Sequence, residues 1–81
     1  MMSNIKSVYQ IKNYGKIVFH VKEIMDKKNL TRYSLSKLAN VRFEVADKWY
    51  KGEIERIDAD ILSRICYVLD CDISDIMTYE K

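Results

Sequence analysis

The sequence predicts an all-α fold, a compact bundle of four to five short helices in a single small domain. The chain has 81 residues, with no proline and two glycines, so it is poor in the residues that interrupt helices. Apolar residues recur at helical spacing along most of its length. A chain this short has a small core, so we expect most apolar helix positions to be buried.

The first helix is predicted over residues 17–28. It ends at Asn29, a residue type that tolerates the left-handed conformation after a helix. Its apolar positions at helical spacing are Val18, Val21, Ile24 and Met25.

The residues before this helix fit neither the helical nor the strand period, and we assign residues 1–16 to an N-terminal arm and 17–81 to the folded domain. A flexible arm, a strand and a segment that docks on a partner all remain open for the arm. The alternation of Ile17, Phe19 and Val21 also allows a short strand ahead of the first helix, paired with residues 77–80.

Two helices separated by a tight turn follow, over residues 31–39 and 42–50. Thr31 can cap the first, because its side-chain oxygen can accept a free backbone N–H. Asn40 is suited to the left-handed turn between the helices, and Gly52 ends the second. A helix of about nine residues is not stable alone in water, so packing must hold it.

Two further helices are predicted after Gly52, each preceded by an aspartate that can act as its cap. Asp58 precedes the fourth helix, whose buried stripe is predicted to be Ile61, Leu62, Ile65, Cys66, Val68 and Leu69. Asp72 precedes a last short helix that carries Ile73, Ile76 and Met77.

The helix over residues 42–50 has two different faces on a wheel of about 100° per residue. Val45, Ala46 and Trp49 point one way and form the predicted packing face, with Trp49 as the main core aromatic. The residues predicted to be exposed are Phe43, Glu44, Asp47, Lys48 and Lys51.

Charge is distributed unevenly along the chain. Residues 1–52 carry eleven Lys or Arg against four Asp or Glu, and residues 53–81 carry three against eight. The chain therefore predicts a positive face that attracts polyanions, although lysines that merely solvate helix surfaces would give the same count.

Several classes of function lack support. No apolar run approaches the roughly 18 residues of a membrane span, and no secretory signal is evident, so we expect a cytoplasmic protein. Cys66 and Cys71 with one histidine are too few for a four-ligand zinc site. His20 has no arranged nucleophile around it, and no phosphate loop or cofactor motif is present, so we expect no enzyme.

The hinged pair of helices and the segment that follows it resemble the Cro and lambda-repressor type of helix-turn-helix regulators, the XRE family. The resemblance rests on Leu30-Thr31, Leu35, Leu38-Ala39-Asn40-Val41, Trp49, Gly52 and the run IDADILSRICYVLDCDISDI. It implies a lambda-repressor-like domain with its motif at about residues 31–52, a transcriptional regulator that binds double-stranded DNA. By the same resemblance the second helix of the motif enters the major groove. Because a single domain of this size contacts only one half-site, we expect a homodimer on a two-fold operator.

Carried over by position, the resemblance implies two sets of contacts. Base edges would be reached by Phe43, Glu44 and Lys48, with Asp47 bordering them in the same set. Phosphates would be held by Arg32, Arg42 and Lys51.

The chain departs from the family at some of these positions. Asn40 stands where glycine is usual, Arg42 where a Ser-like cap is usual, and Phe43 and Glu44 where small polar or basic residues are usual. Glu44 repels phosphates but can accept from cytosine N4. The alternative is a repressor-like scaffold that binds a protein through the same face, with Phe43 and Tyr50 as apolar anchors.

Overall fold

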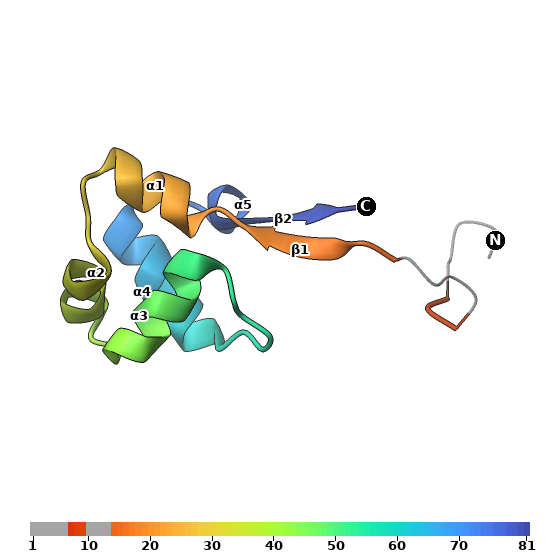
Figure 1. Ribbon diagram of the computed structural model, residues 1–81, viewed down its shortest axis with the longest axis horizontal. Helices are drawn as coiled ribbons and strands as arrows, with labels where there is room; N and C mark the ends of the chain where they lie inside the picture. The colour runs from red at the N-terminus through yellow and green to blue at the C-terminus, as the bar shows by residue number, and fades with distance from the viewer. Residues whose placement is uncertain (1–6, 10–13) are drawn as a thin grey trace.

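The computed structural model describes residues 7–9 and 14–81, and the predicted arm at 1–6 and 10–13 lies outside the described residues. Five helices form a compact body from which a two-stranded ribbon projects (Figure 1). The helices are α1 (Val21–Lys27), α2 (Arg32–Ala39), α3 (Phe43–Lys51), α4 (Ala59–Leu69) and α5 (Ile73–Ile76); the strands are β1 (Lys16–Phe19) and β2 (Met77–Glu80). The predicted bundle of short helices with a terminal strand pair is therefore confirmed.

The segment predicted as the start of the first helix is different in the structure. Residues 16–19 form β1, which pairs antiparallel with β2 in the register Lys16↔Glu80 to Phe19↔Met77. The prediction of a helix over 17–28 was wrong for its first four residues, and the alternative of a strand was right for Ile17 and Phe19. Val21 is already in α1. His20 lies between the two elements, and its backbone N–H donates to the carbonyl of Ile76 at 2.6 Å.

Local side-chain chemistry sets the other helix ends as predicted. Thr31 Oγ1 accepts from the backbone N–H of Ser34 at 3.0 Å, and Asp58 Oδ1 accepts from those of Asp60 and Ile61. Asn40 adopts the left-handed conformation at φ 54°, as does Gly52 at φ 74°. Each is a residue type with a low cost for positive φ.

The core lies where α1, α2, α3 and α4 meet, and α5 adds one buried residue. Its fully or nearly fully buried members are Val21, Met25, Leu35, Ala39, Ala46, Trp49, Ile65, Leu69 and Ile76. Trp49 is 3% exposed, and its ring meets that of Phe19 edge to face at 5.6 Å between centroids. The prediction that Trp49 is the core aromatic is confirmed.

The last helix is shorter than predicted, and only one of its isoleucines is buried. Ile76 is fully buried, but Ile73 is 56% exposed on the short helix α5. Met77, predicted in that helix, is the first residue of β2.

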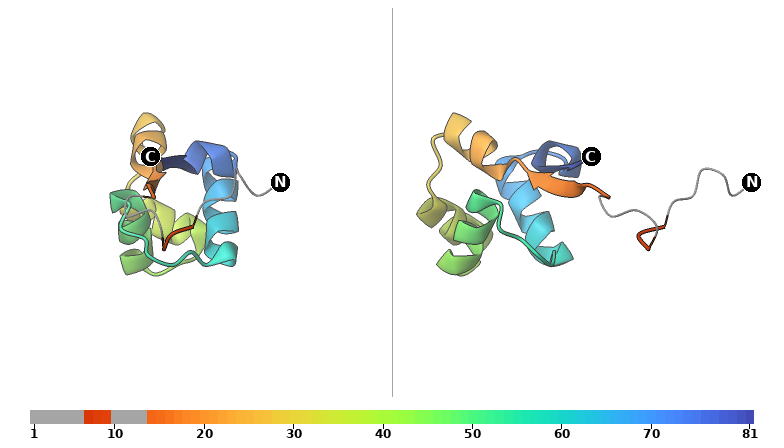
Figure 2. Two further views of the ribbon diagram at one scale, coloured as in Figure 1. Left: turned by 90° about the vertical axis from the view of Figure 1, so that its right-hand side faces the viewer. Right: turned by 45° about the vertical axis from the view of Figure 1, so that its right-hand side comes forward.

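The ribbon differs from the helical body in its surroundings. Figure 2 shows that β1 and β2 run away from the helices, with the C-terminal end of the chain on that side of the molecule. Ile17 and Tyr79, opposite each other in the register, are 47% and 57% exposed. The ribbon is held mainly by its own backbone pairing and by the contact of Phe19 with the core.

Candidate nucleic-acid interface

The turn between α2 and α3 fixes the angle of the two helices. Val41 donates its backbone N–H to the carbonyl of Ser36 at 3.0 Å, and Ser36 Oγ donates to the carbonyl of Val41 at 2.7 Å. Arg64 of α4 donates to the carbonyl of Asn40 at 2.9 Å. The turn is therefore tied both to α2 and to the helix behind it, and α3 is presented as a rigid element.

We did not predict the role of Arg64 at the turn, because in the sequence it is an ordinary cation on an amphipathic helix. It also pairs with Asp60 at 2.9 Å, one turn earlier in α4. This spacing was a readable signal for the ion pair, but its reach to Asn40 depends on the fold.

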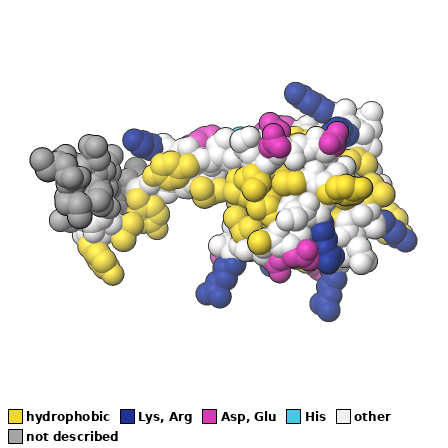
Figure 3. All heavy atoms as spheres, turned by 180° about the vertical axis from the view of Figure 1, so that it is seen from behind, with side chains coloured by type: hydrophobic (Ala, Val, Ile, Leu, Met, Phe, Trp, Pro, Cys, Tyr) yellow, Lys and Arg dark blue, Asp and Glu magenta, His cyan; other side chains and the backbone are white. Residues whose placement is uncertain are grey.

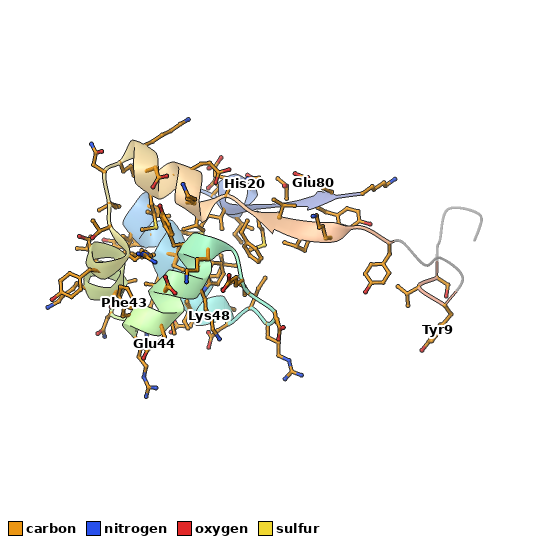
Figure 4. All side chains as sticks on the ribbon, viewed as in Figure 1. Tyr9, His20, Phe43, Glu44, Lys48 and Glu80 are labelled. Carbon is orange, nitrogen blue, oxygen red and sulfur yellow. The ribbon has the colours of Figure 1, made fainter. Side chains whose placement is uncertain are left out.

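One face of α3 is open to solvent, on the side of the body away from α1. Figure 4 shows Phe43, Glu44 and Lys48 along this helix, at the bottom of the view. Phe43 is 45% exposed, and Glu44 and Lys48 are exposed as predicted. No cation within the described ranges lies at ion-pair distance from Glu44. The carboxylate of Glu44 and the ammonium of Lys48 are thus presented to solvent one turn apart.

Asp47 differs from the exposed residues with which it was predicted. Its side chain is 22% exposed, and its two oxygens pair with Arg32 at 2.5 Å and with Lys51 at 3.1 Å. The prediction that Asp47 lies on the fully exposed face was wrong, because the turn brings the start of α2 against this side of α3. The ion pairs with Lys51 and then Arg32 lower the pKa of the Asp47 carboxyl from its ordinary value.

Arg32 is also held by two aromatic rings. Its Cζ lies 5.9 Å from the centroid of Phe43 and 5.4 Å from that of Tyr50. These distances are within the range of cation–π attraction.

Tyr50 joins α3 to α1 as well. Its hydroxyl donates to Asp26 at 3.0 Å, and Lys22 Nζ donates to the same carboxylate at 2.8 Å. The hydrogen bonds from Lys22 and then Tyr50 lower the pKa of Asp26. Tyr50 is half-buried, so of the two anchors predicted for a protein partner only Phe43 is well exposed.

Basic side chains surround this face. Arg42, at the N-cap of α3, is exposed, and so are Lys37 of α2 and Arg56 in the loop before α4. Lys48 and Arg56 border a surface hollow that also contains Glu53 and Glu55. In Figure 3, seen from behind, Lys and Arg side chains extend from the lower edge of the helical body, with acidic groups between them. The face is therefore mixed in charge, not uniformly positive.

The cysteines and the histidine lie outside this face. Cys66 and Cys71 are free and half-buried, and burial is the main cause that raises the pKa of each thiol. His20 Nε2 is 2.9 Å from Thr78 Oγ1, so it links the start of α1 to the ribbon. In the described residues no group of His, Cys, Asp and Glu is arranged to hold a metal ion, and no helix is long and apolar enough to cross a bilayer.

The predicted contact residues thus fall into two groups. Phe43, Glu44, Lys48 and Arg42 lie at the open face and its start, whereas Arg32, Asp47 and Lys51 are joined to one another at its border. The sequence did not reveal this second group as a unit, because its members lie 15 and 4 residues apart on two helices whose angle the sequence does not state.

Comparison with known proteins agrees with this geometry. The Cro/C1-type HTH DNA-binding domain matches residues 20–81, from the start of α1 to the last residue. A search of the curated proteins finds no significant match. The family match covers most of the chain, it contains the α2–turn–α3 pair, and its members are DNA-binding domains and not enzymes. The chain belongs to the Cro/C1-type helix-turn-helix DNA-binding domains.

Proposed function

We propose that this protein is a sequence-specific transcriptional regulator that binds an operator with α3 in the major groove of double-stranded DNA. The observation that carries the proposal is the open face of α3, which presents Phe43, Glu44 and Lys48 beside a turn fixed by hydrogen bonds. A rigid helix with three adjacent side chains of different chemistry suits the reading of base edges. The compartment that we propose is the cytoplasm.

The roles we assign follow the positions of the side chains. Lys48 can donate to guanine O6 or N7, Glu44 can accept from cytosine N4, and Phe43 can cover a thymine methyl group. Asp47 was predicted to border these three residues, but Arg32 and Lys51 hold its two carboxylate oxygens, and we assign no base to it. Arg42, at the start of α3, is assigned to a phosphate, and phosphate contacts position a protein without reading sequence.

We further propose that the protein binds as a homodimer. One α3 can read only a few base pairs, and a second copy one helical turn along the duplex doubles the contacts. The expected operator is a palindrome with half-sites about 34 Å apart, centre to centre. Whether the bound protein represses or activates transcription depends on where the operator lies relative to the promoter.

Selection of bound sequences from a random DNA pool tests the proposal. We expect enrichment of a palindrome, with sedimentation of the protein on the enriched duplex showing two chains per site. Recovery of a single half-site would keep sequence-specific binding and overturn the dimer. Absence of any enrichment would favour the other candidate, a protein-binding scaffold that uses the exposed ring of Phe43.

Substitutions can distinguish the side chains that read bases from the side chain that only binds a phosphate. Lys48→Ala and Glu44→Ala are each expected to change the preferred base at one position, by about 1 to 3 kcal/mol of discrimination. Arg42→Ala is expected to weaken all sequences about equally and to reduce the salt slope by roughly one. Lys16→Ala, which removes an exposed cation from the ribbon, is the matched control and should change neither quantity. Unchanged base preference in both α3 variants would show that α3 is not the reading helix.

A further inference from the structure

The proposed function does not explain why Arg32 and Lys51 are both paired with the carboxylate of Asp47. Each oxygen of the Asp47 carboxylate takes one cation, Oδ1 from Arg32 at 2.5 Å and Oδ2 from Lys51 at 3.1 Å. Both cations are nevertheless nearly half exposed, at 42% and 47% of their side chains. They are therefore accessible to a polyanion, but their charge is already partly neutralised from within.

The position of Arg32 is defined by more than this ion pair. Phe43, Asp47 and Tyr50 are four and three residues apart, so they form one stripe along α3. The guanidinium from α2 lies on this stripe, against both rings and the carboxylate. Arg32 is thus kept beside the α3 face, next to residues assigned to the DNA.

We infer that Asp47 is an internal competitor of DNA phosphate, a residue that weakens sequence-independent binding by holding the two cations Arg32 and Lys51. This inference rests on the proposed function of α3 as the reading helix. A carboxylate and a phosphate present similar oxygens to a guanidinium, and arginine binds either in the same forked geometry. A phosphate that approaches Arg32 or Lys51 must therefore displace Asp47 or share its cations.

The expected consequence differs between the two kinds of DNA contact. Sequence-independent affinity comes from phosphates neutralised by cations, and each adds about 0.9 to the salt slope. Base contacts by Glu44 and Lys48 do not involve the cations that Asp47 holds. The competitor therefore lowers affinity for all duplexes and leaves the difference between duplexes to the open face.

The test is Asp47→Asn, titrated with a 20-base-pair duplex of mixed sequence at several salt concentrations. Freeing one cation for a phosphate should raise affinity at 0.1 M salt by about eightfold and steepen the salt slope by about one. The ratio of affinities for the selected operator and the mixed duplex should stay the same, because a phosphate contact is common to both duplexes. Circular dichroism checks that the variant is folded; if it is not, Asp47→Ser removes the same charge.

Glu44→Gln is the matched comparison, because it removes one carboxylate from α3, three residues before Asp47. Among the described residues no cation is paired with Glu44. Loss of general repulsion alone should raise its affinity for the mixed duplex by less than about twofold, with little change of slope. Arg32→Gln, measured in the parent and in Asp47→Asn, provides a second test. It should lower affinity about eightfold in the Asp47→Asn background and less than about twofold in the parent.

Three outcomes would overturn the inference. Equal gains in Asp47→Asn and Glu44→Gln would show a general charge effect, and a loss of affinity in folded Asp47→Asn would show that the carboxylate only orients Arg32. Equal effects of Arg32→Gln in both backgrounds would show that Asp47 does not restrain it. Absence of DNA binding by every variant, the parent included, would instead overturn the proposed function, and the inference with it.

Discussion

The helical body and the β1–β2 ribbon are stabilised in different ways. In the body, nine apolar side chains are buried between four helices and α5, and the helix ends are closed by side chains within a few residues of them. In the ribbon, four residue pairs are joined along the backbone, and side chains such as Ile17 and Tyr79 stay about half exposed. A two-stranded sheet alone is at best marginally stable in water. The ribbon therefore depends on the body, whereas the body does not depend on the ribbon to the same degree.

The largest expected effect is in the body. Trp49→Ala removes the buried indole of α3 that packs against Phe19, and the cavity should lower the free energy of unfolding by about 3 to 5 kcal/mol. Such a loss is a large part of the stability of a small domain. Urea unfolding followed by circular dichroism measures it. A loss below about 1 kcal/mol would mean that the body does not depend on this ring.

A smaller effect is expected where the ribbon begins. Gly15 has φ +92°, and a Cβ there would lie 2.7 Å from the carbonyl oxygen of Glu80. Gly15→Ala should therefore cost roughly 1 to 3 kcal/mol, and hydrogen exchange should quicken for β1 amides but not for α2 or α3. Gly52→Ala is the control in the body: it has φ +74° too, but the nearest atom to its Cβ is 3.6 Å away, so only the left-handed conformation should cost, about 1 to 2 kcal/mol, with no quickening of exchange confined to β1. Uniform acceleration of exchange in Gly15→Ala would contradict the separation of the two regions.

The smallest expected effect is on the pH dependence of the free energy of unfolding. Ion pairs lower the folded-state pKa of Asp47 and of Asp26 below their ordinary value of 3.8. A lowered carboxyl pKa gives stability that is present above the ordinary value and is lost as the pH falls through the folded value. The difference in unfolding free energy between the parent and Asp47→Asn should therefore shrink as the pH falls below about 4. Thermal melts from pH 7 to pH 2 test this, and a difference that does not change with pH would exclude the ion pairs as its source.

The same contrast explains how much the sequence could predict. The ends of α2, α3 and α4 were predictable because Thr31, Asn40, Gly52 and Asp58 act on backbone groups next to them. The burial of Ala46 and Trp49 and the exposure of Phe43, Glu44 and Lys48 were predictable from helical period alone. The correct family followed because its motif consists of such local signals in fixed order.

The failures concern contacts between residues far apart in the chain. Val18 fits the helical period of Val21, Ile24 and Met25, but residues 16–19 are a strand because β2, about 60 residues later, offers them backbone partners. Periodicity in one segment carries no information about such a partner. Asp47 was likewise placed on the open face, because the approach of Arg32 depends on the angle at Asn40. The site was therefore predictable as a list of residues but not as two groups with different surroundings.

The register Lys16↔Glu80 also sets an order of events during synthesis. Strand β1 is among the first described residues to be made, and it must wait without a partner until Met77–Glu80 has been translated. At ordinary rates of about 5 to 20 residues per second, that interval is several seconds. The loop that the ribbon closes contains all five helices, so helix packing shortens the distance its ends must cover and lowers the entropy cost of closing it. Among the elements that the structure describes, the ribbon is thus the last that can form, and before Met77–Glu80 is made Ile17 and Phe19 lie in a strand without its partner.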